Sequence, residues 1–86
     1  MNTIAITNPA LSPRFKRTDL AMVDQSRMPA LGDEVIAEIN GTQVAGDVLR
    51  IDGDSMTVEH CISGEMINLR WVPGVVIGRM RQPMAN

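Results

Sequence analysis

The sequence predicts an all-β domain, a small meander or partial barrel with a loop-like N-terminal arm. Short apolar stretches, alternating or continuous, recur between residues 20 and 81. Asn-Gly, Asp-Gly, Ser-Gly and Pro-Gly pairs separate these stretches, as turns separate strands. No stretch of about ten residues or more has the 3.6-residue periodicity of an amphipathic helix.

The early part of the chain contains one short strand signal. Residues 20–23 are apolar and lie between two aspartates, and the proline-containing stretch 25–31 that follows is expected to be a loop. Residues 34–39 then alternate between two faces, and Asn40-Gly41 follows at once. Asn-Gly is the strongest short hairpin signal, because both residues tolerate the positive φ of a type I′ turn.

The rest of the chain is expected to continue as a meander. A strand over residues 44–51 contains Gly46, which indicates a bulge or a close approach of another backbone. Three more strands are expected over residues 56–60, 66–71 and 75–81, separated by Asp52-Gly53, Ser63-Gly64 and Pro73-Gly74 and ended by Pro83.

The length of 86 residues predicts one domain, made of a flexible arm over 1–9, a β domain over 10–81 and a tail over 82–86. Apolar residues make up 44% of the chain and charged residues 21%, as in ordinary globular proteins. A domain this small buries only about 60% of the surface that its unfolded chain exposes. Self-association would therefore stabilise it.

Composition argues against several classes of function. Phe15 and Trp71 are the only aromatic residues, too few for a platform that stacks single-stranded nucleic acid. The net charge of −2 argues against a protein that binds the phosphate backbone directly. One histidine and one cysteine cannot build a zinc site, so neither a metal nor a cofactor is expected.

The sequence also predicts a cytoplasmic location. Cys61 has no partner for an internal disulfide, which suits a reducing compartment. No apolar run approaches the roughly 18 residues of a membrane span. The first ten residues lack the basic start and apolar core of a signal peptide. We therefore expect no membrane partner.

Acidic residues concentrate in the middle of the chain. From residue 33 to residue 65 there are eight acidic residues and one arginine, a net charge of −7. This segment predicts an acidic surface for a basic partner, and the alternative is that the acids lie at turns and on solvated faces. The residues of the predicted surface are Glu34, Glu38, Asp47, Asp52, Asp54 and Glu59.

Three stretches occur in a familiar order and spacing: Asp-Leu-Ala-Met-Val-Asp over 19–24, Gly-Asp-Glu-Val-Ile over 32–36 and Gly-Val-Val-Ile-Gly-Arg-Met-Arg over 74–81. Together they resemble the C-terminal peptidase domain of LexA and related phage repressors, over residues 8–81. The resemblance implies a small LexA-type peptidase-like β domain. It also implies a homodimer that forms partly through the last strand.

The last predicted strand supports a dimer on its own pattern. Val75, Val76 and Ile77 are consecutive β-branched residues, so both faces of the strand are apolar, and Met80 extends that surface. One face can be covered by the core of the domain, and the other needs a partner. The alternative is that the strand lies in the centre of the monomer's own sheet.

The resemblance implies that the chain is catalytically dead. In the family a serine attacks the scissile carbonyl, and a buried, neutral lysine takes its proton. The aligned positions here are Ala10 and Gly46, and the only lysine of the chain is Lys16. The nine residues before Ala10 are also too few for the DNA-binding domain that the family carries upstream. We therefore predict no enzyme activity.

The predicted function is a protein-binding regulator, phage-borne, that pairs with itself or with a full-length repressor, as an antirepressor does. One alternative is a small acidic inhibitor or DNA mimic that binds a nucleic-acid-binding host protein. Another is an unorthodox serine peptidase that uses Ser55 with His60, although the Asp52-Gly53-Asp54-Ser55 stretch has the composition of a hairpin turn.

Overall fold

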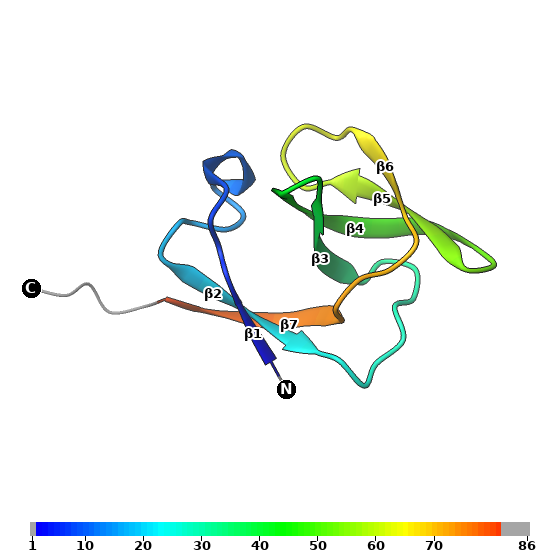
Figure 1. The fold of residues 1–86 in the computed structure, drawn as a ribbon, viewed down its shortest axis with the longest axis horizontal. Coiled ribbons are helices and arrows are strands. Elements are labelled where there is room, and N and C mark those ends of the chain that lie inside the picture. The colour runs from blue at the N-terminus through cyan, green and yellow to red at the C-terminus, as the bar shows by residue number, and fades with distance from the viewer. Residues whose placement is uncertain (1, 82–86) are drawn as a thin grey trace, which may run out of the picture.

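A computed structural model describes residues 2–81, which form seven strands and one 3₁₀ turn (Figure 1). The all-β class and the meander are confirmed. No helix in this range is long and apolar enough to cross a membrane. The strands are β1 (Asn2–Ala5), β2 (Asp19–Asp24), β3 (Glu34–Ile39), β4 (Thr42–Asp52), β5 (Ser55–His60), β6 (Met66–Leu69) and β7 (Val75–Arg81), and the turn is Pro9–Leu11.

The strands form one antiparallel sheet in the order β1-β2-β7-β3-β4-β5-β6. Strands β3 to β6 follow one another as a meander, and β7 then returns to lie between β2 and β3. Only one register pair, Val35 with Val75, joins β7 to β3. The sheet therefore divides into two arms, β1-β2-β7 and β3-β4-β5-β6, which diverge from this seam (Figure 1).

The Asn-Gly turn forms as expected between β3 and β4. Asn40 has a φ of 51° and Gly41 a φ of 81°, so both adopt the positive φ that the tight hairpin requires. The turn sets the register from Ile39 opposite Thr42 to Glu34 opposite Asp47. The hairpin was predictable because this pair of residues determines both the turn and the pairing that follows.

Two apolar clusters form the core. The first lies between the two arms and contains Ile6, Leu11, Phe15, Ala21, Val23, Ile36, Ala45 and Val76. The second lies on the other face of the meander and contains Val35, Ala37, Val48, Val58, Leu69 and Val72. Strand β3 contributes to both, because neighbouring side chains of a strand point to opposite faces. It is therefore buried on both sides.

The N-terminal arm is part of the sheet, which differs from the flexible, loop-like arm predicted from the sequence. Strand β1 pairs with β2 along its whole length, from Asn2 opposite Val23 to Ala5 opposite Leu20. Ile6 follows and is buried in the first core cluster. Backbone pairing and this one anchor fix an arm whose short sequence has no strong strand pattern.

Gln43, buried in β4, holds the end of the arm. Its side-chain oxygen accepts hydrogen bonds from the backbone nitrogens of Thr7 at 2.9 Å and Asn8 at 3.3 Å. Its amide nitrogen donates to the carbonyl oxygen of Ala5 at 2.8 Å. The Asn8 side chain in turn donates to the carbonyl oxygen of Gln43 at 2.9 Å. One buried amide thus satisfies three backbone groups that no strand pairs.

Gly46 marks a close approach of two backbones, one of the two outcomes predicted for it. A Cβ atom at this position would lie 1.9 Å from the carbonyl oxygen of Glu59 and 2.9 Å from a methyl carbon of Val58. The bulge of β4 lies a little further on, between Val48 and Arg50. Position 46 therefore excludes every side chain in this conformation.

Gly46→Ala should destabilise the fold by about 3 kcal/mol or more, because the new methyl group must push β5 away. Gly78→Ala is the matched control, since Gly78 also lies in a strand and its nearest neighbour would be the Met22 sulfur at 3.7 Å. The control should change stability by no more than about 1 kcal/mol. Urea denaturation of the two variants measures the difference, and equal stabilities would contradict the close packing of β4 on β5.

Gln43→Ala should cost about 2–4 kcal/mol, because it leaves Ala5, Thr7 and Asn8 with unpaired backbone groups. Gln25→Ala, at an exposed loop position, should leave stability within about 0.5 kcal/mol of the wild type. Hydrogen exchange should show that the amides of Thr7 and Asn8 lose protection first in the Gln43 variant. Unchanged protection there would mean that Gln43 does not hold the arm.

Candidate functional site

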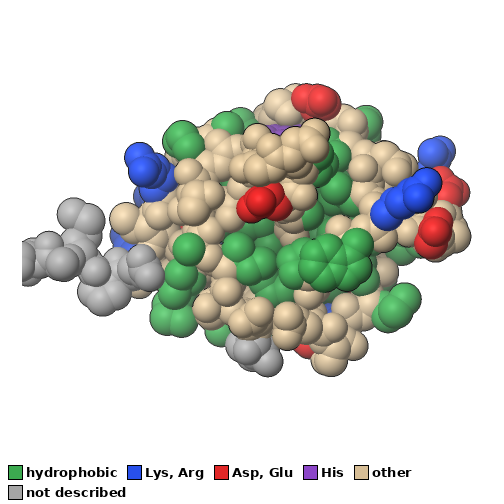
Figure 2. Space-filling model, in the orientation of Figure 1, with side chains coloured by type: hydrophobic (Ala, Val, Ile, Leu, Met, Phe, Trp, Pro, Cys, Tyr) green, Lys and Arg blue, Asp and Glu red, His purple; other side chains and the backbone are tan. Residues whose placement is uncertain are grey.

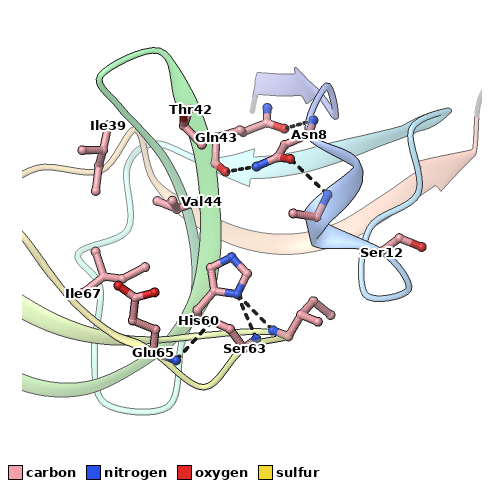
Figure 3. A pocket seen from close by; sticks show the side chains of 12 residues that line it. Asn8, Ser12, Ile39, Thr42, Gln43, Val44, His60, Ser63, Glu65 and Ile67 are labelled. Carbon is pink, nitrogen blue, oxygen red and sulfur yellow. Dashed lines mark hydrogen bonds between the residues drawn. The ribbon is translucent and has the colours of Figure 1, made fainter.

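The two positions that the resemblance aligns with a catalytic serine and lysine lie near one cleft. Ala10 lies on the 3₁₀ turn, and Gly46 pairs with His60 across β4 and β5. Ala10 and His60 both line a cleft of about 730 Å³ between the β3–β4 hairpin, the β5–β6 turn and residues 8–12 (Figure 3). Neither aligned position has a reactive side chain, and position 46 has no space for one.

The imidazole of His60 is occupied by the β5–β6 turn. Its Nδ1 atom accepts hydrogen bonds from the backbone nitrogens of Ile62 and Ser63, both at 3.2 Å. Two donors at Nδ1 place the proton of the neutral ring on Nε2. Figure 3 shows the hydroxyl of Ser12 directed away from this ring. The cleft therefore contains a histidine that orders a turn, without a nucleophile paired to it.

The Ser55 and His60 pair considered from the sequence is not brought together. These residues are the first and last of β5, which separates them by roughly 16 Å along the strand. The Ser55 hydroxyl donates to the carbonyl oxygen of Asp52 at 3.2 Å, as expected in a hairpin turn. Cys61 packs against the first core cluster, and burial raises the pKa of its thiol. It is therefore not an activated nucleophile.

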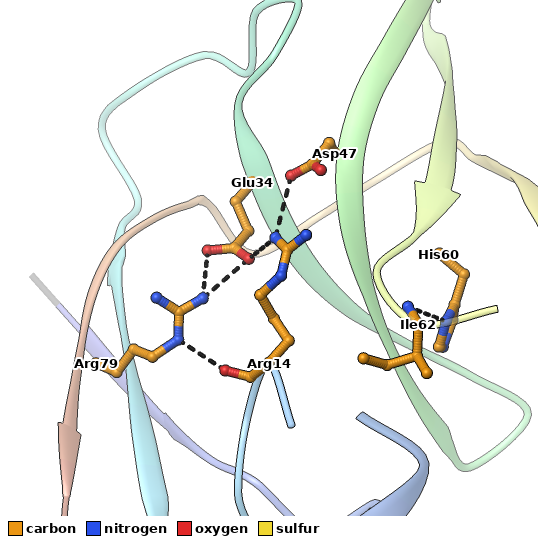
Figure 4. A network of polar contacts seen from close by, with 6 residues as sticks. All are labelled: Arg14, Glu34, Asp47, His60, Ile62 and Arg79. Carbon is orange, nitrogen blue, oxygen red and sulfur yellow. Dashed lines mark hydrogen bonds and ion pairs between the residues drawn. The ribbon is translucent and has the colours of Figure 1, made fainter. Parts of the chain in front are cut away.

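Three residues of the predicted acidic surface pair with arginines of the same chain, two of them in the network of Figure 4. Glu34 accepts from Arg14 at 2.6 Å and from Arg79 at 2.9 Å, and its side chain is mostly buried. Arg14 also lies 3.4 Å from Asp47, and the hydrogen bond to Glu34 raises the pKa of Arg14. Asp52 pairs with Arg50 at 2.8 Å. These ion pairs reduce the acidic surface that the sequence predicted.

The other three predicted acids have no ion pair among residues 2–81, but they lie on different elements. Glu38 is near the end of β3, Asp54 is in the β4–β5 turn, and Glu59 is opposite Asp47 on β5. Acids that are close in the sequence are thus distributed over several parts of the surface. The unpaired acids lie at a turn or on strands, as in the alternative of turns and solvated faces, whereas the pairing of the other three within the chain belongs to neither alternative.

Two of the four residues predicted for a dimer interface on β7 are buried within the chain itself. Val75 and Val76 are only 1% and 8% exposed in the monomer, because the chain's own core covers them. The strand lies between β2 and β3, the alternative left open by the sequence. Ile77 and Met80 remain exposed, at 43% and 47%.

The two most exposed of the large apolar side chains lie elsewhere, at one site that the sequence did not predict. Met28 is 85% exposed and Trp71 is 74% exposed. Residues 25–29, 51–56 and 70–74 meet there around a groove of about 340 Å³. We call this the Trp71 surface. Its apolar lining residues are Met28, Pro29, Ile51, Met56, Trp71, Val72 and Pro73, and its charged lining residues are Arg27, Asp54 and Arg70. The available signal was a bulky apolar residue near a proline, Met28 in a predicted loop and Trp71 at the end of a predicted strand.

One face of the molecule carries a pronounced apolar patch. Figure 2 shows hydrophobic side chains grouped around the middle of this face, with an acidic side chain beside them and basic side chains toward its two ends. Surface patches of this kind mark interaction sites more often than scattered apolar residues do.

Comparison of the chain with protein-family models, curated proteins and solved structures finds no match. The resemblance to the LexA peptidase domain therefore depends on the sequence stretches alone.

Val76→Asp should prevent folding, because it buries an unpaired carboxylate in the first core cluster. Ile77→Asp, one residue further on the exposed face, should cost no more than about 1 kcal/mol. Circular dichroism and thermal denaturation separate the two outcomes. A folded, monomeric Val76→Asp variant would instead show that β7 is an interface strand. Light scattering of the Ile77→Asp variant tests whether the exposed side chains of β7, Ile77 and Met80, take part in a dimer.

Proposed function

We propose that the chain is a non-enzymatic protein-interaction domain that binds its partner through the Trp71 surface. The exposure of Trp71, at 74%, carries this proposal. Tryptophan buries a large area at low entropic cost and is enriched among the residues that dominate binding energy. Met28 adds an adaptable apolar contact at the same groove.

The core does not account for the position of Trp71. Its neighbour Val72 is buried in the second core cluster, whereas Trp71 belongs to neither cluster. Gly74 fixes the same connection, since a Cβ there would lie 2.5 Å from the carbonyl oxygen of Asp24. The tryptophan is thus presented on an anchored segment. Anchoring before binding lowers the entropic cost of association.

The LexA resemblance supplies the finer proposal. The domain would act in the cytoplasm as a phage-borne regulator that pairs with a second copy or with a full-length repressor. Pairing with one repressor subunit would disable a dimer that needs two DNA-binding arms, because operators match a two-fold symmetric protein. Exposed Ile77 and Met80 offer a second apolar contact for such pairing. An acidic mimic of DNA has less support, since four of the eight acids between residues 33 and 65 are paired with arginines.

Photocrosslinking tests the site and the kind of partner together. With p-benzoylphenylalanine in place of Met28, irradiation of the source cells should give one discrete adduct. The same replacement of Met66, which is 57% exposed on the edge strand β6, is the control and should give none.

The mass of the adduct then identifies the partner class. A band at twice the 9.4 kDa of the chain indicates a second copy, and any other discrete mass indicates a different protein. Equal crosslinking from both positions, or none from position 28, would contradict the proposed surface.

A further inference from the structure

A smaller hollow shares Trp71 and Pro73 with the Trp71 surface. Its volume is about 210 Å³, and strands β1, β3 and β4 meet the connection between β6 and β7 there. The apolar part of its lining is Ile4, Ile36, Ala37, Trp71 and Pro73, and the polar part is Glu38 and Gln43. Small-molecule sites usually measure about 300–1,000 Å³, so this hollow suits a single side chain better than a cofactor.

Glu38 is the only charged residue in the lining. It is exposed, and it forms no ion pair or side-chain hydrogen bond among residues 2–81. The other polar group, Gln43, already uses its amide to hold residues 5–8. The hollow therefore combines apolar walls and an indole with one carboxylate that has no partner in the described chain.

A basic side chain matches this combination. The methylene stem of lysine or arginine is apolar and its end is cationic, so such a side chain can cover apolar surface and still reach a carboxylate. An indole ring attracts cations through its quadrupole. The chain holds one of its own cations in the same way: the Arg79 guanidinium lies 4.3 Å from the Phe15 ring centre and binds Glu34.

We propose that this hollow binds a lysine or arginine side chain of a partner protein, between Trp71 and Glu38. The proposal rests on the Trp71 surface as the docking site and adds the chemistry that selects the partner. A second copy of this chain is a poorer source of the cation. Its net charge is −2, and four of its eight cationic residues, Arg14, Arg27, Arg50 and Arg79, already bind carboxylates of the same chain.

Peptide binding tests the proposal directly. The probes are fluorescein-labelled peptides in which glycine alternates with lysine, arginine or serine, and their binding is followed by fluorescence polarisation. Trp71 is the only tryptophan, so its intrinsic emission reports occupancy of the hollow with unlabelled peptide. The lysine or arginine peptide should bind and perturb that emission, whereas the serine peptide should do neither.

Glu38→Gln should weaken binding of the basic peptide about threefold to fivefold, the upper part of the range for one exposed ion pair. Glu65→Gln is the control, because Glu65 is exposed, lines the other cleft and carries the same charge. It should weaken binding less than about twofold. Equal weakening by both variants would reduce the effect to general electrostatics and overturn the proposal, as would a wild type that binds neither basic peptide at about 1 mM.

Two further outcomes separate this proposal from the docking site on which it rests. If Trp71→Ala weakens binding and Glu38→Gln does not, the Trp71 surface stands and the cation site is overturned. If Glu38→Gln weakens binding while position 28 gives no crosslink, the cation site stands and the wider docking surface fails. If the wild type self-associates and Glu38→Gln abolishes that association, the hollow binds a second copy of the chain. That outcome would contradict the proposal that the cation comes from a different protein.

Discussion

The fold depends on the seam at which the two arms of the sheet meet. Backbone pairing there is limited to Val35 and Val75, which cannot by itself fix the angle between the arms. Side chains supply the rest of the connection. Phe15, Ile36 and Val76 are buried together in the cluster between the arms. Arg79 on β7 binds Glu34 on β3, and Arg14 binds the same carboxylate from the loop before β2 (Figure 4).

The seam also explains where the Trp71 surface lies. Residues 70–74 carry the chain from β6 in one arm to β7 in the other, so this connection crosses between the arms. The hollow beside Trp71 is lined by Ile4 from one arm and Glu38 from the other. A side chain bound there contacts both arms, and it would stabilise their relative arrangement by mass action on the folded state.

Local sequence signals predicted the parts of the fold that local interactions determine. Asn40-Gly41 determined one hairpin, and the alternation of residues 34–39 predicted the apolar face of β3 that contains Val35 and Ala37, but not the burial of Ile36 on the other face. The position of β7 could not be predicted in this way, because an apolar strand has the same pattern at an interface and at the centre of a sheet. Strand β1 has four residues and is mostly exposed, so its pairing depends on β2 rather than on its own composition.

The acidic segment shows why charge counted along a sequence is a poor guide to charge on a surface. Arg14 is 20 residues from Glu34 and Arg79 is 45 residues away, yet both bind it. The excess of acid between residues 33 and 65 is thus offset by cations from the flanking segments, which no count within the segment can include. The acids of the predicted surface that have no ion pair among residues 2–81 are Glu38, Asp54 and Glu59, which lie on different elements. What each of them can bind therefore depends on the residues around it.

Glu38 differs from the other unpaired acids because of those neighbours. It shares a face of the sheet with Ile36 and lies opposite Gln43, so the alternation of β3 places it beside apolar walls. An apolar groove such as the one under Met28 gains affinity from any partner that fills it. In the hollow next to that groove, Glu38 discriminates among the side chains that enter, because an acidic side chain is repelled there and a neutral one leaves the charge unpaired. The indole at Trp71 therefore supplies binding energy, and Glu38 supplies the selection of a basic partner.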